Sequence, residues 1–193
     1  MIDEHNNDGT QWARFSDDRT LRYRLARDLR PTWSPFEPWL DPGDTQNIPT
    51  ATRIVFVMLN PSKADAFRLD PTVSKCVKFA TAWGFNVIEI VNIFPYRSTD
   101  PDALYSWTRG LAGADWENIN AANTAEIGDA CRRAGRVIAA WGKHGAHFAQ
   151  GTIVRLGLHE AGIKLHCLDT NKDGSPKHPL YIKGGTEPKE WNL

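Results

Sequence analysis

The stretch "VFVMLNPSKAD", residues 55–65, decides the fold that we expect, because an apolar run ends there in a polar corner. The apolar run suits a buried strand. The corner consists of turn-forming and charged residues, namely Asn60, Pro61, Ser62, Lys63 and Asp65. Two interpretations are open: a plain turn, or a ligand site, since open α/β sheets bind ligands at the carboxyl ends of their strands.

Strand and helix patterns alternate from residue 52 onward, which favours crossover units around a parallel sheet. The expected strands cover residues 53–59, 87–91, 136–140 and 164–168. Asp70-Pro71 and Asp100-Pro101 each look like a helix N-cap followed by proline at the first helical position. We therefore predict an α/β fold, a three-layer α/β/α sandwich with a central, mainly parallel four-stranded sheet.

The first 50 residues differ from the remainder of the chain. Within them, "TLRYRL" (20–25) alternates like a half-exposed strand, and "RPTWSPFEPWLDPGD" (30–44) carries four prolines that favour extended loops. We expect residues 1–50 to form an N-terminal extension packed on an α/β domain of residues 51–193. A chain of 193 residues suits one compact domain overall.

The composition is that of a soluble globular protein, with 41% hydrophobic and 24% charged residues. No stretch approaches the roughly 18 continuous apolar residues of a membrane span. The polar, acidic start is unlike a secretory signal, so we expect a cytoplasmic protein. The three cysteines form no CxxC pair and lie in apolar patterns, which favours reduced core thiols: Cys76, Cys131 and Cys167.

The formal net charge is zero, which argues against a strongly cationic nucleic-acid coat. From residue 131 onward, however, ten Lys and Arg face five Asp and Glu, which fits either a solvated surface or a phosphate-binding face. His144 and His147 lie three residues apart without an evident third ligand, so neither a metal nor a cofactor is expected. The sequence leaves the oligomeric state open.

Polar or turn-forming residues follow each expected strand: Asn60, Asn92, Gly142 and His178. Because the carboxyl ends of parallel strands meet at one edge, these residues are expected to line a single crevice. Each also has an ordinary structural explanation. Asn60 would make an Asx turn, Asn92 would bond loop backbone, and His178 would be an exposed loop histidine.

Long motifs through nearly the whole chain resemble a bacterial family defined only as a domain of unknown function, number 1643. The resemblance rests on "RYRLARDL", "LNPSKAD", "DPTVSKC", "WGFNVIEIVNIFPYRSTDP", "AAWGKHG" and "KDGSPKHPLY". The resemblance to this family does not imply an activity.

A more distant resemblance, over about residues 52–181, is to the uracil-DNA glycosylase-like superfamily. It rests on Asn60-Pro61, on Asn92 at the end of the second strand, on "AAWG", and on His178-Pro179. Two departures stand out: the Asp-Pro version of the first motif is missing, and "LY" replaces the usual Ser-Pro after His178-Pro179. The resemblance implies a uracil-DNA glycosylase-like fold and a nucleobase-recognising N-glycosidase that acts on DNA or a nucleotide-like substrate.

The residue types suit that chemistry. His178 would donate a hydrogen bond to the departing base, and the amide of Asn92 would match a base edge. Asn60 would hold the attacking water, with Asp65 as a possible base. Substrate contacts are expected from Pro61, Ser62, Lys63, Gly142 and Pro179, of which Ser62 and Lys63 would lie near phosphate.

Two other function classes stay open. The missing Asp-Pro favours a non-catalytic module that binds a nucleic acid or a nucleotide in the same crevice. An enzyme with different chemistry is a further alternative, because a fold does not fix a function.

Overall fold

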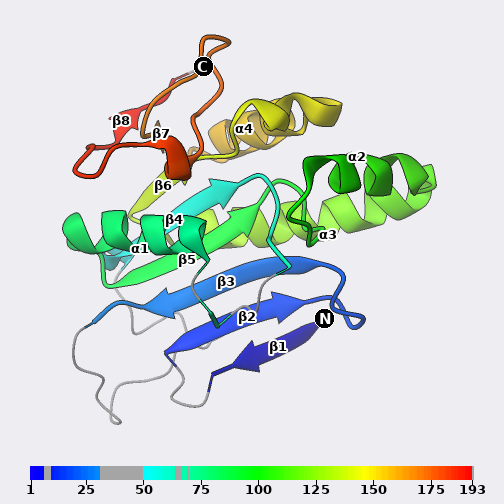
Figure 1. The fold of residues 1–193 in the computed structure, drawn as a ribbon, viewed down its shortest axis with the longest axis horizontal. Helices are drawn as coiled ribbons and strands as arrows, with labels where there is room; N and C mark the ends of the chain where they lie inside the picture. The colour runs from blue at the N-terminus through cyan, green and yellow to red at the C-terminus, as the bar shows by residue number, and fades with distance from the viewer. Residues whose placement is uncertain (7–9, 31–49, 64–66, 69, 193) are drawn as a thin grey trace.

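One mixed sheet runs through the protein, and helices lie on both of its faces (Figure 1). The computed structural model describes residues 1–6, 10–30, 50–63, 67–68 and 70–192. Within these ranges the sheet has eight strands in the order β1-β2-β3-β5-β4-β6-β7-β8. The predicted α/β class is therefore confirmed, whereas the Pro-rich loops predicted at 30–44 lie almost entirely outside the described residues.

The strands and helices have the following bounds. The strands are β1 Ile2–His5, β2 Gln11–Phe15, β3 Arg22–Asp28, β4 Arg53–Met58, β5 Val87–Asn92, β6 Arg136–Ala139, β7 Leu165–Cys167 and β8 Lys189–Glu190. The α-helices are α1 Pro71–Ala82, α2 Pro101–Gly110, α3 Gly113–Arg132 and α4 Gln150–Glu160. Short 3₁₀ segments cover Thr50–Thr52, Lys143–Ala149 and Pro179–Tyr181.

The four strands expected from the sequence are adjacent and pair in parallel, in the order β5, β4, β6, β7. The prediction that the sheet would have four strands and be mainly parallel is nevertheless wrong. Strands β1, β2 and β3 continue the sheet beyond β5, and β8 closes its other side, all through antiparallel pairings. Figure 1 shows these N-terminal strands lying in the same sheet as β5.

Strand β3 explains the difference between the predicted and the observed sheet, because its sequence pattern did not indicate a strand in the interior of the sheet. The alternation in residues 20–25 predicted a half-exposed strand, but the residues of β3 up to Arg27 are all buried between β2 and β5. Arg24, 1% exposed, pairs with the buried carboxylate of Glu89 at 2.5 Å. Burial opposes the charge of Arg24, but the charge of Glu89 and its hydrogen bond raise the pKa of the guanidinium. A paired arginine can therefore occupy a position where the pattern indicates solvent.

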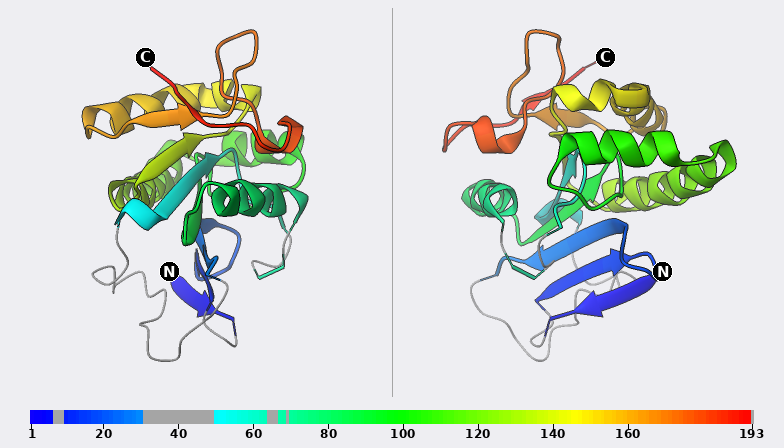
Figure 2. Two further views of the ribbon diagram at one scale, coloured as in Figure 1. Left: turned by 90° about the vertical axis from the view of Figure 1, so that its left-hand side faces the viewer. Right: turned by 45° about the vertical axis from the view of Figure 1, so that its right-hand side comes forward.

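Both faces of the sheet are covered by helices, each face with its own apolar cluster. Helix α1 packs Val73, Cys76 and Phe79 against one face. Helices α2, α3 and α4 pack against the other face, for example through Leu104 and Ile127. The right-hand view of Figure 2 shows α1 across the sheet from α2 and α3.

The predicted helix starts are confirmed. Asp70 caps α1, its side chain accepting a hydrogen bond from the backbone N–H of Val73 at 2.7 Å. Asp100 caps α2 in the same manner through Asp102, and each helix has proline at its first position. The cap of α1 fixes that helix end beside the carboxyl edge of the sheet.

All three cysteines are free and buried, as the sequence predicts. Among the described residues, no helix is long and apolar enough to cross a membrane.

Two glycines make room for the indole of Trp141, which follows β6. A Cβ added at Gly145 would overlap the indole, and one added at Gly151 would lie 2.6 Å from its Nε1. We expect Gly145→Ala to lower the free energy of unfolding by roughly 1–3 kcal/mol, because the indole must shift within a packed core. Gly157→Ala, in the middle of α4 with open space around it, should instead stabilise by about 0.5–1 kcal/mol. Denaturant unfolding followed by fluorescence measures the stability of both variants. Equal changes in the free energy of unfolding would contradict the packing explanation.

Candidate functional site

The carboxyl ends of β4, β5 and β6 border a cleft that consists of two adjoining hollows. The first has a volume of about 360 Å³ and reaches α1, and the second has a volume of about 570 Å³ and reaches the segment after β6. Three residues line both hollows: Asn60, Thr99 and His178. We call the two hollows together the strand-end cleft. Its volume suits a small ligand, for which pockets of about 300–1,000 Å³ are typical.

Asn60 follows β4 and ties two loops together. Its Nδ2 donates to the backbone carbonyl of Ser98 at 2.8 Å and also lies 3.3 Å from that of Tyr96. Within the described part of the chain, no donor reaches its Oδ1. Asn60 thus has a structural role through its nitrogen, while its oxygen remains available to a water or a ligand.

Asn92, the last residue of β5, lines the first hollow and is only 1% exposed. Its Nδ2 is buried and finds no hydrogen-bond partner among the described residues. A buried amide without a partner costs roughly 1–3 kcal/mol. Such a group is expected where a ligand supplies the missing acceptor.

His178 lies opposite the β4 corner, after the long loop that follows β7. Its Nδ1 accepts a long hydrogen bond from the backbone N–H of Leu180, at 3.4 Å, which leaves the proton of the neutral ring on Nε2. Burial lowers the pKa of His178, although Asp70 acts in the opposite direction. The side chain is therefore a neutral donor at pH 7. Gly142 is close by, since a Cβ at that position would lie 3.7 Å from the Cβ of His178.

The cleft thus brings Asn60, Asn92, Gly142 and His178 together, as the strand-end argument expects. Gly142 has a φ of +72°, a left-handed conformation that favours glycine.

The remaining site residues predicted from the sequence have mixed outcomes. Pro61 and Ser62 line the first hollow, and the Ser62 hydroxyl donates to Asp70 at 2.9 Å. Lys63 is exposed, Pro179 is buried, and neither of them lines either hollow. Asp65 lies outside the described residues.

Arg22 is the residue that the sequence argument missed. It begins β3, lines the first hollow and is 4% exposed. Burial lowers the pKa of Arg22 to about 10, repulsion by Arg97 adds to that effect, and attraction by Asp70 opposes it. The available signal was the density of arginines in "LRYRLARDL" (21–29), which is unusual for a strand between two others.

The two neighbouring histidines each bond a hydroxyl group of α2. His144 bonds the hydroxyl of Tyr105 through Nδ1 at 2.6 Å, and His147 bonds that of Thr108 through Nε2 at 2.8 Å. Burial and Arg109 lower the pKa of His147. In the described ranges, no group of three His, Cys, Asp or Glu side chains is placed to hold a metal.

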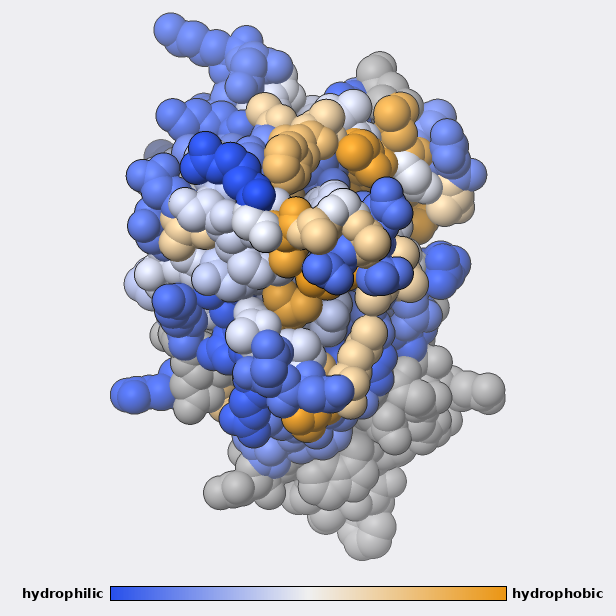
Figure 3. All heavy atoms as spheres, turned by 90° about the vertical axis from the view of Figure 1, so that its right-hand side faces the viewer, coloured by the Kyte–Doolittle hydropathy of each residue, from blue (hydrophilic) through white to orange (hydrophobic). Residues whose placement is uncertain are grey.

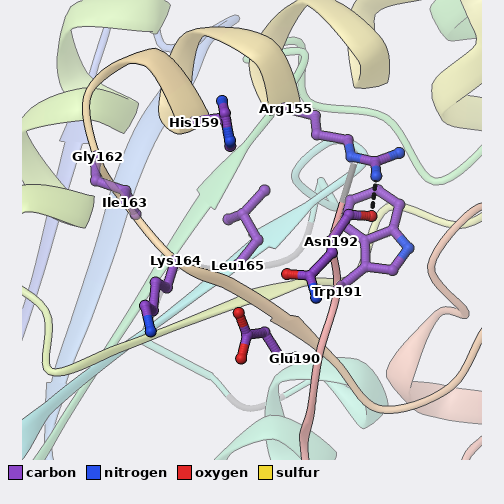
Figure 4. Close-up of a pocket in the computed structure, with 9 residues that line it drawn as sticks. All are labelled: Arg155, His159, Gly162, Ile163, Lys164, Leu165, Glu190, Trp191 and Asn192. Atoms are coloured by element: carbon purple, nitrogen blue, oxygen red, sulfur yellow. Dashed lines mark hydrogen bonds between the residues drawn. The ribbon is translucent and has the colours of Figure 1, made fainter.

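Figure 4 shows another hollow, of about 440 Å³, beside α4, β7 and β8. There the guanidinium of Arg155 donates to the backbone carbonyl of Asn192 and lies 4.1 Å from the ring centre of Trp191. Charged side chains at its border, such as Lys164 and Glu190, are exposed to water. Water therefore satisfies these two side chains, although the Nε of Arg155 is buried without a partner among the described residues.

The surface in Figure 3 shows hydrophobic side chains gathered among hydrophilic ones on one side of the molecule. Phe148 is the most exposed phenylalanine of the described residues, at 48%. Its ring contacts those of His147 and Trp116 at centroid distances of 4.4 and 6.2 Å. These contacts account for its position without a ligand.

The part of the chain that matches a known family includes almost all residues of the cleft. A family model described as a protein of unknown function (DUF1643) matches residues 22–180, a range that includes Arg22, Asn60, Asn92 and His178. No curated protein and no solved structure matches the chain. Since the match spans well over half of the sequence, this chain belongs to the DUF1643 family.

Proposed function

We propose that the strand-end cleft recognises a nucleobase and that the protein acts as an N-glycosidase on DNA or on a nucleotide-like substrate. The observation that carries this proposal is the buried, unpartnered amide of Asn92, which lines one hollow with Asn60 and His178. An amide presents a donor beside an acceptor, which complements the edge of a pyrimidine or purine.

Residues on two sides of the cleft would have different tasks in the cleavage reaction. Cleavage of a glycosidic bond leaves negative charge on the base, and the Nε2–H of neutral His178 is a donor for that charge. On the side of β4, the free Oδ1 of Asn60 would accept a hydrogen bond from the attacking water. The resemblance to the uracil-DNA glycosylase-like superfamily, with helices on both faces of a sheet and the same motif order, supports these roles.

The second candidate is a module that binds a nucleobase without cleaving it. Of the described residues that line the cleft, Asp70 is the only carboxylate. One of its oxygens accepts from the N–H of Val73 and the other from the hydroxyl of Ser62. A carboxylate engaged in this way is a poor base, which favours the binder.

Base release distinguishes the two candidates. The protein is incubated with duplexes that carry modified or mismatched bases, with single strands and with free nucleotides, and the products are analysed for free base and abasic sites. Release from any substrate supports the N-glycosidase, provided that His178→Ala slows it by about 30-fold or more. Saturable binding without release supports the binding module.

Asn92→Ala is expected to weaken recognition while leaving the fold intact. Because its side chain bonds no described residue, its loss should change the free energy of unfolding by less than about 1 kcal/mol, whereas ligand affinity should fall roughly 10- to 100-fold. The matched control is Asn123→Ala, since the buried Asn123 bonds the backbone carbonyls of Asn92 and Ile93. That variant should lose stability. Similar stability losses in both variants would show that Asn92 is structural.

A further inference from the structure

Arg22 is a buried cation that forms no ion pair with any described residue. Its side chain makes no hydrogen bond or ion pair with any described residue, and its Nε is among the buried atoms that lack a partner. A buried charge is costly unless it is paired. By contrast, Arg24, two residues further on, is paired with Glu89 and Asp129.

A β-bulge accounts for the direction of Arg22. Strand alternation alone would place Arg22 on the same face as Arg24, whose partners lie on the α3 side. The register with β2 shifts, however, so that Arg14 pairs with Arg24 but the next residue, Phe15, pairs with Arg22. The extra residue, Tyr23, changes the face that the strand presents. Arg22 therefore lines the hollow on the α1 side.

The surroundings of Arg22 favour a negative ligand. The hollow includes the first turn of α1, where Pro71 and Thr72 lie at the positive end of a 12-residue helix. Asp70 faces the same hollow and attracts Arg22 without forming an ion pair with it, because its two oxygens cap the helix and accept from Ser62. The positive charge of Arg97 adds to the positive potential around Arg22.

We propose that Arg22 binds the terminal phosphate of a nucleoside monophosphate, so that the substrate class of the cleft is a mononucleotide. The proposal rests on the proposed function for the base, because Asn92 in the same hollow would read its edge. A guanidinium offers bidentate hydrogen bonds that match a phosphate. With Arg22 only 4% exposed, a terminal phosphate fits better than an internal one, whose chain must continue in two directions.

Isothermal titration calorimetry tests the proposal with four probes: deoxynucleoside 5′-monophosphates, the matching nucleosides, inorganic phosphate, and a single-stranded oligonucleotide without terminal phosphates. We expect the best monophosphate to bind about 100-fold more tightly than its nucleoside. Arg22→Met should remove that difference and leave nucleoside affinity unchanged. The exposed Arg132 supplies the control, and Arg132→Met should behave like the wild type.

A second measurement separates ligand binding from a structural role. If Arg22 awaits a ligand, Arg22→Met should raise the melting temperature of the ligand-free protein, by about 2–4 °C or more, because an unpaired buried charge is removed. A lower melting temperature would overturn the proposal. Arg22→Lys keeps the charge but loses the bidentate geometry, and it should retain only part of the preference for monophosphates.

The proposal fails if monophosphates bind no better than nucleosides, or if the unphosphorylated oligonucleotide binds as tightly as a mononucleotide and depends on Arg22. Base-release assays on the same variants distinguish this failure from that of the proposed function. Release that is equal in wild type and Arg22→Met overturns the phosphate site but leaves the N-glycosidase intact. Arg22-dependent binding of monophosphates without any release supports the phosphate site and overturns the N-glycosidase.

Discussion

Glu89→Ala is expected to lower the free energy of unfolding by roughly 3–5 kcal/mol, the range for breaking a buried ion pair from one side. Glu89 is 0% exposed and pairs with two arginines, Arg24 of β3 and Arg53 of β4. Its removal leaves two buried cations without their shared anion. Urea unfolding gives the measurement, and Glu117→Ala, at an exposed position on α3, should change stability by less than about 0.5 kcal/mol.

A triple variant shows whether charge or volume causes the loss. Replacing Arg24, Glu89 and Arg53 together by methionine removes the charges without leaving a large cavity. We expect it to recover most of the stability that Glu89→Ala loses. If the triple variant is less stable than Glu89→Ala, the ion-pair explanation is wrong, and the packing of these side chains dominates.

His178→Ala is expected to lower the turnover of base release by roughly 30- to 1,000-fold, equivalent to about 2–4 kcal/mol of barrier, with little change in substrate binding. The reason is that a donor to the departing base acts most strongly when charge develops in the transition state. Single-turnover rates and separate affinity measurements give the two effects. His159→Ala serves as the control, since His159 is exposed on α4 and lines neither hollow of the cleft. Full turnover in His178→Ala would assign this histidine to the loop structure alone.

Local patterns sufficed for the parts of the fold that depend on neighbouring residues. Short stretches of sequence predict the helix caps at Asp70 and Asp100 and the strand through residues 55–58. The structure has these elements at the predicted positions. The convergence of Asn60 and His178 followed from one rule about parallel strands.

What sequence reasoning missed depends on partners far away in the chain. Arg24 looks like a surface residue until Glu89 is known to lie against it, so β3 was given too exposed a position. The direction of Arg22 depends on a register shift against β2, which no periodicity reports. Lys63 was predicted to contact the substrate because of its neighbours in sequence, but its side chain is exposed to solvent and does not line the cleft.

Strand β3 has two roles in the structure: it pairs with β5, and it carries a residue that lines the cleft. By pairing with β5, it covers backbone groups that would otherwise form an open sheet edge, the kind of edge on which proteins aggregate. The same strand carries Arg22 into the cleft. A chain cut back to the parallel strands alone would expose the edge of β5 and remove Arg22 from the cleft, so the cleft is complete only when β3 and the segment that carries His178 are both in place.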